Sequence, residues 1–268
     1  MSLSGSTIII TGASSGIGES LAKKLGSAGA NIVLAARTRE KLEKICGDIQ
    51  GNGGLACAVS TDITKEDDCK NLAQQAVNNF GGIDILILNA GISMWAPFEE
   101  INDVSFFKDI MDINYMGSVY CVHSALPELK KSKGKIVAVT TAQAITGFPN
   151  HAGYSAAKHA LHGFLETLDI ELEGSIKFMN AYLGWINGTN LRGNAFGADG
   201  NKIGGGYQSH NHHAIELEVC TDRIIKAIKS EKKKVYIPGK LRLIPFLNIF
   251  RKKWLHKKIL NAVRNQNP

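Results

Sequence analysis

The sequence predicts a single doubly wound α/β domain with a central parallel sheet, and three observations lead to this prediction. Short, continuous apolar runs alternate with segments of helical spacing, which is typical of parallel strands covered on both faces. A glycine-rich turn joins the first apolar run to the first helical segment, as in a β-α-β unit. The 268 residues are 44% hydrophobic, which is enough for a sizeable core, and no linker divides the chain.

The elements are expected in the following order. Continuous apolar and β-branched runs predict strands at residues 7–10, 31–36, 55–60, 83–88, 135–140, 176–183 and 235–237. Apolar residues at three- and four-residue spacing predict helices at 16–25, 40–50, 65–80, 105–126, 154–172 and 216–230. Right-handed crossovers complete the doubly wound topology. The glycine-rich segment 188–208 has little periodicity, and a loop of this length is typically functional or disordered.

Composition narrows the class of protein. Five scattered cysteines without a C-x-x-C pair indicate reduced thiols in a reducing compartment. The sequence shows neither a signal-peptide pattern nor an apolar stretch of about 18 residues, so we expect a cytoplasmic protein without a transmembrane helix. Residues 223–268 hold fourteen Lys/Arg and one acid (net +13), whereas residues 1–222 hold seventeen Lys/Arg and twenty-three acids (net −6). The basic character therefore belongs to the C-terminal segment.

The turn at residues 11–18 reads Thr-Gly-Ala-Ser-Ser-Gly-Ile-Gly. Gly12 permits a tight turn, and Gly16 and Gly18 let a pyrophosphate approach backbone N–H groups at a helix N-terminus. An ordinary glycine-rich turn is the alternative, but the position after the first strand favours dinucleotide binding. The cofactor-binding residues expected here are Gly12, Ser14, Ser15, Gly16, Ile17 and Gly18.

The end of the second strand indicates which dinucleotide binds. An acid at this point would bind the ribose 2′-hydroxyl of NAD, but the sequence has Arg37 with Thr38 beside it. A guanidinium can pair with the 2′-phosphate of NADP. An ordinary surface arginine is the alternative, and we favour NADP(H) over NAD.

Tyr154 and Lys158 supply the second strong signal. At i and i+4 they lie on one helix face, where a nearby ammonium favours the phenolate and lowers the tyrosine pKa toward neutrality. Thr141, at the end of a strand, offers a hydroxyl to the same substrate oxygen. Asn114, within a helical pattern, is a candidate to hold a water or carbonyl in a proton relay, although it could also be a polar residue on a solvated face. The predicted catalytic residues are Asn114, Thr141, Tyr154 and Lys158.

These residues together resemble the short-chain dehydrogenase/reductase family, to about residue 238. The resemblance implies a Rossmann-type domain and an oxidoreductase that transfers hydride between NADP(H) and a carbonyl or secondary alcohol. It further implies that Asp62 and Ile63 flank the adenine and that Lys158 holds the nicotinamide ribose. The turn after the fourth strand would support the cofactor through Asn89, Ala90 and Gly91. The resemblance also suggests a homodimer or homotetramer.

Two departures from the family pattern stand out. The usual catalytic serine is Thr141, which keeps the hydroxyl but narrows the site. The usual Pro-Gly after the sixth strand is Leu183-Gly184, followed by Ile186, whose backbone would bind the carboxamide, and by Thr189. The nicotinamide clamp therefore differs from the usual one. The Leu-Gly pair resembles the 11β-hydroxysteroid dehydrogenase-like branch, and residues 113–120 resemble 3-ketosphinganine reductases. Both imply a small lipophilic substrate, steroid-like or a long-chain ketone.

The C-terminal extension, residues 240–268, interleaves aromatic and aliphatic residues with Lys and Arg and contains Pro245, which is expected to break any helix early. This pattern favours peripheral contact with a membrane surface. A core-packed extension, a subunit contact and a solvated tail are the alternatives. Nucleic acid is not expected as a partner, because no reading motif accompanies the charge.

The remaining predictions concern the substrate end of the site. We expect residues 1–239 to form the NADP-binding and catalytic domain, with a substrate lid around residues 188–215. Trp95, beyond the fourth strand, is expected either to line the substrate pocket or to be an ordinary core aromatic. The histidines at 210, 212 and 213 do not have metal-ligand spacing, so no metal is predicted. A catalytically impaired NADP-binding sensor or scaffold remains the alternative function.

Overall fold

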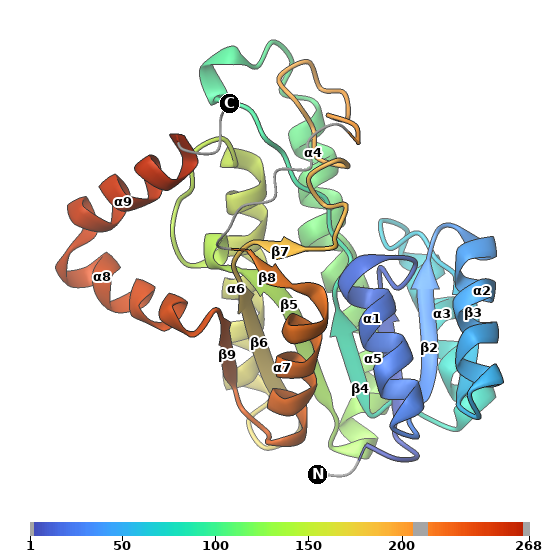
Figure 1. The fold of residues 1–268 in the computed structure, drawn as a ribbon. Coiled ribbons are helices and arrows are strands. Elements are labelled where there is room, and N and C mark those ends of the chain that lie inside the picture. The colour runs from blue at the N-terminus through green and yellow to red at the C-terminus, as the bar shows by residue number, and fades with distance from the viewer. Residues whose placement is uncertain (1–2, 206–213, 265–268) are drawn as a thin grey trace.

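The computed structural model describes residues 3–205 and 214–264 and confirms the predicted α/β fold (Figure 1). Within these residues, seven parallel strands form one sheet in the order β3-β2-β1-β4-β5-β6-β9. Their bounds are Thr7–Thr11 (β1), Asn31–Ala36 (β2), Leu55–Ser60 (β3), Ile85–Leu88 (β4), Lys135–Thr141 (β5), Lys177–Leu183 (β6) and Lys234–Ile237 (β9). The winding direction reverses between β1 and β4, and in such sheets ligands bind beyond the strand ends at that point.

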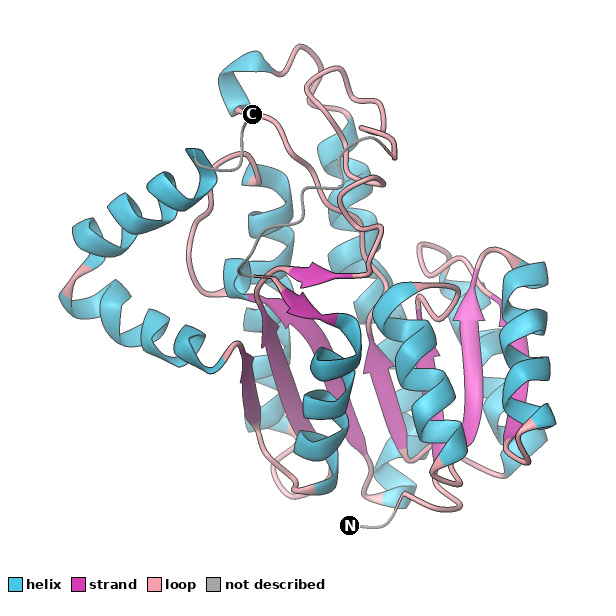
Figure 2. Cartoon of the chain, in the orientation of Figure 1, coloured by secondary structure: helices cyan, strands magenta, loops and turns pink. Residues whose placement is uncertain are grey.

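Helices cover both faces of the sheet (Figure 2). One face packs against α1 (Gly16–Ser27), α2 (Arg39–Gly51) and α7 (Leu217–Lys229). The other packs against α3 (Glu66–Phe80), α5 (Gly117–Ser132) and α6 (Ala152–Glu171). Because successive strand residues point to opposite faces, Ile8 and Ile10 join the first core and Ile9 joins the second. The continuous apolar runs of the sequence thus serve two cores at once.

The helix predicted at residues 105–126 is not one regular helix. It consists of α4 (Phe106–Met111), a π-helical turn (Asp112–Met116) and α5, which ends at Ser132. A π-turn accommodates one extra residue in a helix, and such turns occur mostly at functional sites. Asn114 lies in the middle of this one.

The C-terminal segment folds into α8 (Ile244–Phe250) and α9 (Lys252–Arg264), an arm that leaves the sheet after β9 (Figure 1). The expectation that Pro245 breaks any helix early is therefore wrong. Pro245 lies in the first turn of α8, where its missing N–H group has no helical partner to lose.

The arm has an inner and an outer face. On the inner face, Leu255 and Ile259 are buried in a small core with Ile244 and Ala142, and Asn248 Nδ2 donates to the Ile145 carbonyl oxygen at 2.6 Å. Other apolar side chains of the arm are exposed, and we call this set the outer face: Leu243, Phe246, Ile249, Phe250, Trp254 and Leu260. The alternative that the C-terminal extension packs against the core of the domain thus holds for the inner face only.

Candidate functional site

The glycine loop lies between β1 and α1. Gly12 and Gly16 have φ angles of +64° and +57°, a region that favours glycine. A β-carbon at Gly12 would lie 2.8 Å from the Ala90 Cα, and one at Gly18 would lie 2.4 Å from the Gly12 carbonyl oxygen. The hydroxyl of Ser15, just before α1, makes no cap hydrogen bond. The loop therefore presents close-packed backbone and a hydroxyl at a helix N-terminus, an arrangement that suits an anion.

The turn after β4 is bonded to this loop. Asn89 Nδ2 donates to the carbonyl oxygens of Thr11 at 3.0 Å and Gly12 at 3.2 Å. The backbone N–H groups of Asn89 and Ala90 both donate to Thr11 Oγ1. Ser14 and Ile17, elsewhere in the loop, are half-buried. Thr11 is a positioning residue that sequence reasoning missed, because a threonine ending a strand carries no signal of its own.

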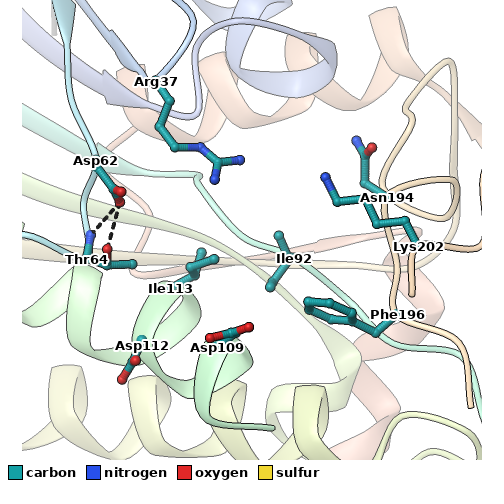
Figure 3. Close-up of a pocket in the computed structure, with 10 residues that line it drawn as sticks. All are labelled: Arg37, Asp62, Thr64, Ile92, Asp109, Asp112, Ile113, Asn194, Phe196 and Lys202. Atoms are coloured by element: carbon teal, nitrogen blue, oxygen red, sulfur yellow. Dashed lines mark hydrogen bonds between the residues drawn. The ribbon is translucent and has the colours of Figure 1, made fainter. Parts of the chain in front are cut away.

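A cavity of about 320 Å³ opens beyond the ends of β2 and β3 (Figure 3). Arg37 and Asp62 reach it from these ends, and Ile92 and Ile113 contribute apolar surface. Burial raises the pKa of the Asp62 carboxyl, but hydrogen bonds from the Thr64 hydroxyl and N–H, with the Arg37 charge, hold that pKa below its usual value. The cavity thus combines an apolar floor with a charged rim.

Two other residues expected near the cofactor lie beside the cavity lining. Ile63 is buried in the core under α5, where a β-carbon added to Gly117 would lie 2.7 Å from its Cδ1 atom. Thr38 precedes the first residue of α2, and its side chain makes no cap hydrogen bond.

Tyr154, Lys158 and Asn114 come together near the start of α6. All three are buried, and Lys158 Nζ lies 5.6 Å from the centroid of the Tyr154 ring. Asn114 Nδ2 donates to two backbone carbonyl oxygens at 2.8 and 3.0 Å. Its Oδ1 atom has no hydrogen-bond partner within the described parts of the chain. A β-carbon at Gly91 would lie 2.6 Å from that oxygen and 3.4 Å from Lys158 Nζ, so both groups border the same small space.

The pKa of Tyr154 shifts in the direction opposite to the predicted one. Burial raises the pKa of the phenol above its ordinary value, because the charged form is poorly solvated. Desolvation is the cause of this shift, and the Lys158 charge, with Nζ 5.6 Å from the ring centroid, does not offset it. Burial also lowers the pKa of Lys158 to about 8. The phenol is therefore a proton donor in this arrangement.

Thr141 ends β5 beside the small core formed with the arm. Its Oγ1 atom donates to the Leu183 carbonyl oxygen at 3.2 Å and accepts from the Gln143 N–H at 3.4 Å. Gln143 is itself buried, and its Oε1 atom lacks a partner among the described residues. The Thr141 hydroxyl thus already donates its proton to a backbone oxygen. To accept a hydrogen bond from this hydroxyl, a substrate oxygen would have to take the place of the Leu183 carbonyl oxygen.

A row of aromatic and basic side chains begins at Tyr154, whose ring lies 6.2 Å from the His151 ring. Trp95 meets the His151 ring edge to face at 5.0 Å, and the Arg192 guanidinium carbon lies 4.0 Å from the Trp95 ring centroid. Burial lowers the pKa of His151 to about 4, so its ring is neutral, with Nδ1 2.9 Å from the Pro149 carbonyl oxygen. His151 and Arg192 were missed by sequence reasoning, because neither belongs to a motif.

The strand-like segments after β6 position the other predicted clamp residues. The Gly184 N–H donates to the Ile237 carbonyl oxygen at 2.7 Å. Ile186 lies in β7 (Ile186–Asn187), which pairs with β8 (Ile215–Glu216). Thr189 faces the glycine loop, since a β-carbon at Gly16 would lie 3.6 Å from its Cγ2 atom. Residues 206–213 of the predicted lid, including its three histidines, lie outside the described residues.

The described residues hold neither a metal-ligand cluster nor a membrane-spanning helix. Over residues 3–205 and 214–264, no cluster of His, Cys, Asp and Glu could hold a metal ion. Among the helices of the same segments, none combines the length and apolarity needed to cross a bilayer.

The comparisons agree on one family. The model of the family "short chain dehydrogenase" matches residues 6–199. The 11-beta-hydroxysteroid dehydrogenase 1A of Arabidopsis thaliana is 38% identical over 202 residues, and the 11-beta-hydroxysteroid dehydrogenase of Pinus massoniana is 39% identical over 192. These alignments cover 75% and 71% of this chain but 58% and 54% of the relatives, so the chain spans little more than half of their length.

Among solved structures, the fold is similar to a short chain dehydrogenase from Burkholderia cenocepacia J2315 in complex with NADP. The TM-score is 0.80 over 97% of this chain and 99% of that one, at 24% identity. At this level of identity the likeness concerns the fold alone.

Proposed function

The chain belongs to the short chain dehydrogenase family, and we propose that it transfers hydride between NADP(H) and the carbonyl or secondary alcohol of a lipophilic substrate. Its relatives also bear out the resemblance to the 11β-hydroxysteroid dehydrogenase-like branch. The observation that carries the proposal is the convergence of Tyr154, Lys158 and Asn114 beside Gly91, close to the glycine loop. This arrangement places a proton donor, Tyr154, next to the loop that would bind the dinucleotide.

The residues present fit a nicotinamide dinucleotide. Gly12 and Gly18 pack closely against the loop itself and the turn after β4, whereas Gly16 has no such close contact. The backbone N–H groups at the start of α1 and the Ser15 hydroxyl, which makes no cap hydrogen bond, would hold the pyrophosphate. By family resemblance, Lys158 holds the nicotinamide ribose, and the backbone of Ile186 holds the carboxamide. Bound NADP(H) supplies or accepts the hydride.

The chain's own side chains manage the proton. Tyr154 gives its phenolic proton to the substrate oxygen in reduction and takes it back in oxidation. Thr141 donates a second hydrogen bond to the same oxygen, which stabilises the charge that develops there. Lys158 supports the phenolate left after the transfer. The Asn114 Oδ1 atom has no hydrogen-bond partner among the described residues. It would accept a hydrogen bond from a water that connects Lys158 to solvent.

Arg37 supports the choice of NADP(H) over NAD. Its guanidinium lines the cavity at the end of β2, and the carboxyl of Asp62 is occupied by hydrogen bonds from Thr64. A planar guanidinium suits a phosphate monoester. The NADP complex of the Burkholderia protein agrees with this assignment for the fold.

Aromatic side chains support a lipophilic substrate. Trp95, Phe148 and His151 gather near Tyr154 and offer flat apolar surface. The relatives' names refer to hydroxysteroids, which are compounds of this class. The chemistry required is a ketone or alcohol on an extended apolar skeleton.

The arm supports peripheral binding to an anionic membrane. Its outer face combines exposed Phe246, Phe250 and Trp254 with a segment whose only acid after residue 222 is Glu231. Such a surface is complementary to anionic lipid headgroups. We assign residues 1–239 to the catalytic domain and 240–268 to this extension. The family resemblance favours a homodimer or homotetramer.

An activity screen tests the proposal. The purified chain is mixed with NADPH and a panel of steroid and long-chain ketones, while cofactor absorbance is followed. Turnover on at least one lipophilic ketone is expected, and loss of turnover in Tyr154→Phe ties it to this site. NADPH binding without turnover on any ketone would favour the alternative of an impaired sensor or scaffold.

A further inference from the structure

The lid brings a second cation into the cavity that holds Arg37. Asn194, Phe196 and Lys202 line the cavity opposite the ends of β2 and β3. Figure 3 shows the terminal nitrogen of Lys202 pointing across the cavity toward the side of the Arg37 guanidinium. No ion pair joins either side chain to another described residue. Sequence reasoning did not single out Lys202.

Backbone hydrogen bonds fix the position of Lys202. Residues 193–204 form a hairpin in which the Ile203 N–H donates to the Ala195 carbonyl oxygen and the Gly204 N–H donates to that of Gly193, each at 3.0 Å. The Trp95 N–H donates to the Phe196 carbonyl oxygen at 2.8 Å, which attaches the hairpin to the chain after β4. Lys202 is thus presented by a folded and anchored segment.

The anchor connects the cavity to the catalytic cluster. The Phe196 ring lies 5.0 Å from the Phe106 ring and packs against the small core that contains Met94 and Tyr154. The same Phe196 side chain lines the cavity. A ligand that binds in the cavity therefore contacts the same hairpin that packs against the small core containing Tyr154.

Acidic side chains also line the cavity. Asp109 and Asp112 lie across the apolar centre from Arg37 and Lys202 in Figure 3. Asp112 is already paired with Lys108, whereas the Asp62 carboxylate lies on the Arg37 side and interacts electrostatically with the guanidinium. Because Asp62 offsets part of the Arg37 charge, the Lys202 ammonium supplies the additional positive charge on this side of the cavity.

We propose that Lys202 and Arg37 together bind the 2′-phosphate of NADP(H), so that the hairpin at residues 193–204 takes part in selecting the phosphorylated cofactor. The inference rests on the proposed cofactor. A phosphate monoester carries close to two negative charges, which two cations from distant segments can share. NADH has a hydroxyl at that position and offers Lys202 no anion. The hairpin therefore adds a second contact to the group that distinguishes NADPH from NADH.

Fluorescence titration with NADPH and with NADH tests the proposal. Lys202→Ala is expected to weaken NADPH binding about tenfold, the loss of a charge-assisted hydrogen bond at a solvent-accessible site, and to leave NADH binding unchanged. Lys202→Arg keeps the charge and should bind NADPH nearly as well as the parent. Lys232→Ala is the matched control, because it removes one exposed charge in the turn between α7 and β9.

Limited trypsin digestion gives a second readout that does not depend on activity. Cleavage after Lys202 should slow with saturating NADPH but not with saturating NADH, relative to cleavage after Lys232. In Lys202→Arg, cleavage at the same position should keep the NADPH protection.

Two results overturn the inference. If Lys202→Ala has no effect on NADPH, Lys202 does not contact the cofactor. If it weakens NADPH and NADH equally, Lys202 contacts the pyrophosphate that both share. If either result occurs while Arg37→Ala loses NADPH binding, the role of Lys202 is wrong but the proposed cofactor is still supported. A parent protein that binds neither cofactor removes both.

Discussion

The amide oxygen of Asn114 and the ammonium nitrogen of Lys158 border the same space beside Gly91. A β-carbon there would lie 2.6 Å from the oxygen and 3.4 Å from the nitrogen. The asparagine cannot move away easily, because its Nδ2 atom is held by two carbonyl oxygens. The glycine is thus a determinant of the catalytic geometry, although it carries no reactive group.

Gly91→Ala should therefore displace Asn114 or Lys158. We expect kcat to fall at least about tenfold, since misplacement by 1 Å can cost about 10²-fold, and the free energy of unfolding to fall by about 1–3 kcal/mol. Steady-state kinetics and urea unfolding measure the two effects. Gly47→Ala, in open space within α2, is the control and should be neutral or stabilising. An unchanged kcat in Gly91→Ala would contradict the proposed relay.

Tyr154→Phe should abolish proton transfer while the ring packing remains. Turnover is expected to fall by about 10²- to 10⁴-fold, the usual contribution of general acid–base catalysis. NADPH affinity, measured by fluorescence, should change little. A variant with near-normal turnover would show that another group supplies the proton.

The Thr141 hydroxyl should be replaceable by serine but not by alanine. Thr141→Ser keeps the donor and should remain active, whereas Thr141→Ala should lose most activity because the developing charge on the substrate oxygen is less stabilised. The alanine variant also loses the hydrogen bond to Leu183, worth about 1 kcal/mol of stability. Equal activity in alanine and parent would leave Thr141 with a structural role only.

Burial of Lys158 should make stability depend on pH between about 8 and 10.5. Its pKa is about 8 in the folded chain and 10.5 ordinarily, so the unfolded chain binds more protons in this window. The stability of the parent relative to Lys158→Met should therefore rise with pH across it, by at most about 3 kcal/mol. Urea unfolding of both proteins at several pH values measures the difference. A flat difference would mean that Lys158 is better solvated than its position implies.

Membrane binding should depend on the outer face of the arm and not on its inner face. Replacing Phe246, Phe250 and Trp254 by serine should abolish flotation with anionic vesicles while leaving the melting temperature close to that of the parent. Ile170→Ser is the control, since this residue is as exposed as the replaced phenylalanines, at 75% against 68% for Phe246 and 72% for Phe250, but lies on α6. Flotation at low and high salt measures the electrostatic part.

Substitutions are preferable to truncation for this test. Asn248 hydrogen-bonds to Thr146 and Ile145, and Ile259 packs against Ala142, directly after Thr141. Removal of the arm would therefore disturb the site as well as the outer face. If the parent chain never floats with anionic vesicles, the membrane proposal is wrong, and a subunit contact or a solvated surface is left for the outer face.

The sequence predicted the sheet well because its strands are buried on both faces. The run that forms β1 contributes Ile8, Ile9 and Ile10 to two cores, and only a parallel sheet between helix layers requires this. The glycine loop could also be predicted from the sequence, because its glycines are required by local backbone geometry.

The remaining features arise from tertiary contacts. Burial sets the direction of the Tyr154 pKa, and the i, i+4 spacing to Lys158 says nothing about burial. The side chains of His151 and Arg192 meet at Trp95 only because the lid folds back onto the chain after β4. For Pro245, the sequence could not distinguish the first turn of a helix from its interior.

The π-helical turn makes the length of one segment, as well as its composition, part of the site. Deleting a single residue from Asp112–Met116 would let α4 and α5 join as one regular helix, and each residue of an α-helix turns the chain by about 100°. Either Asn114 or the buried side of α5 would then face the wrong way. An insertion at Gly53, in a turn with open space around it, should be absorbed. When homologous chains are aligned, a one-residue gap at 112–116 is therefore expected to mark members that lack the proposed relay, even where all four proposed catalytic side chains are retained.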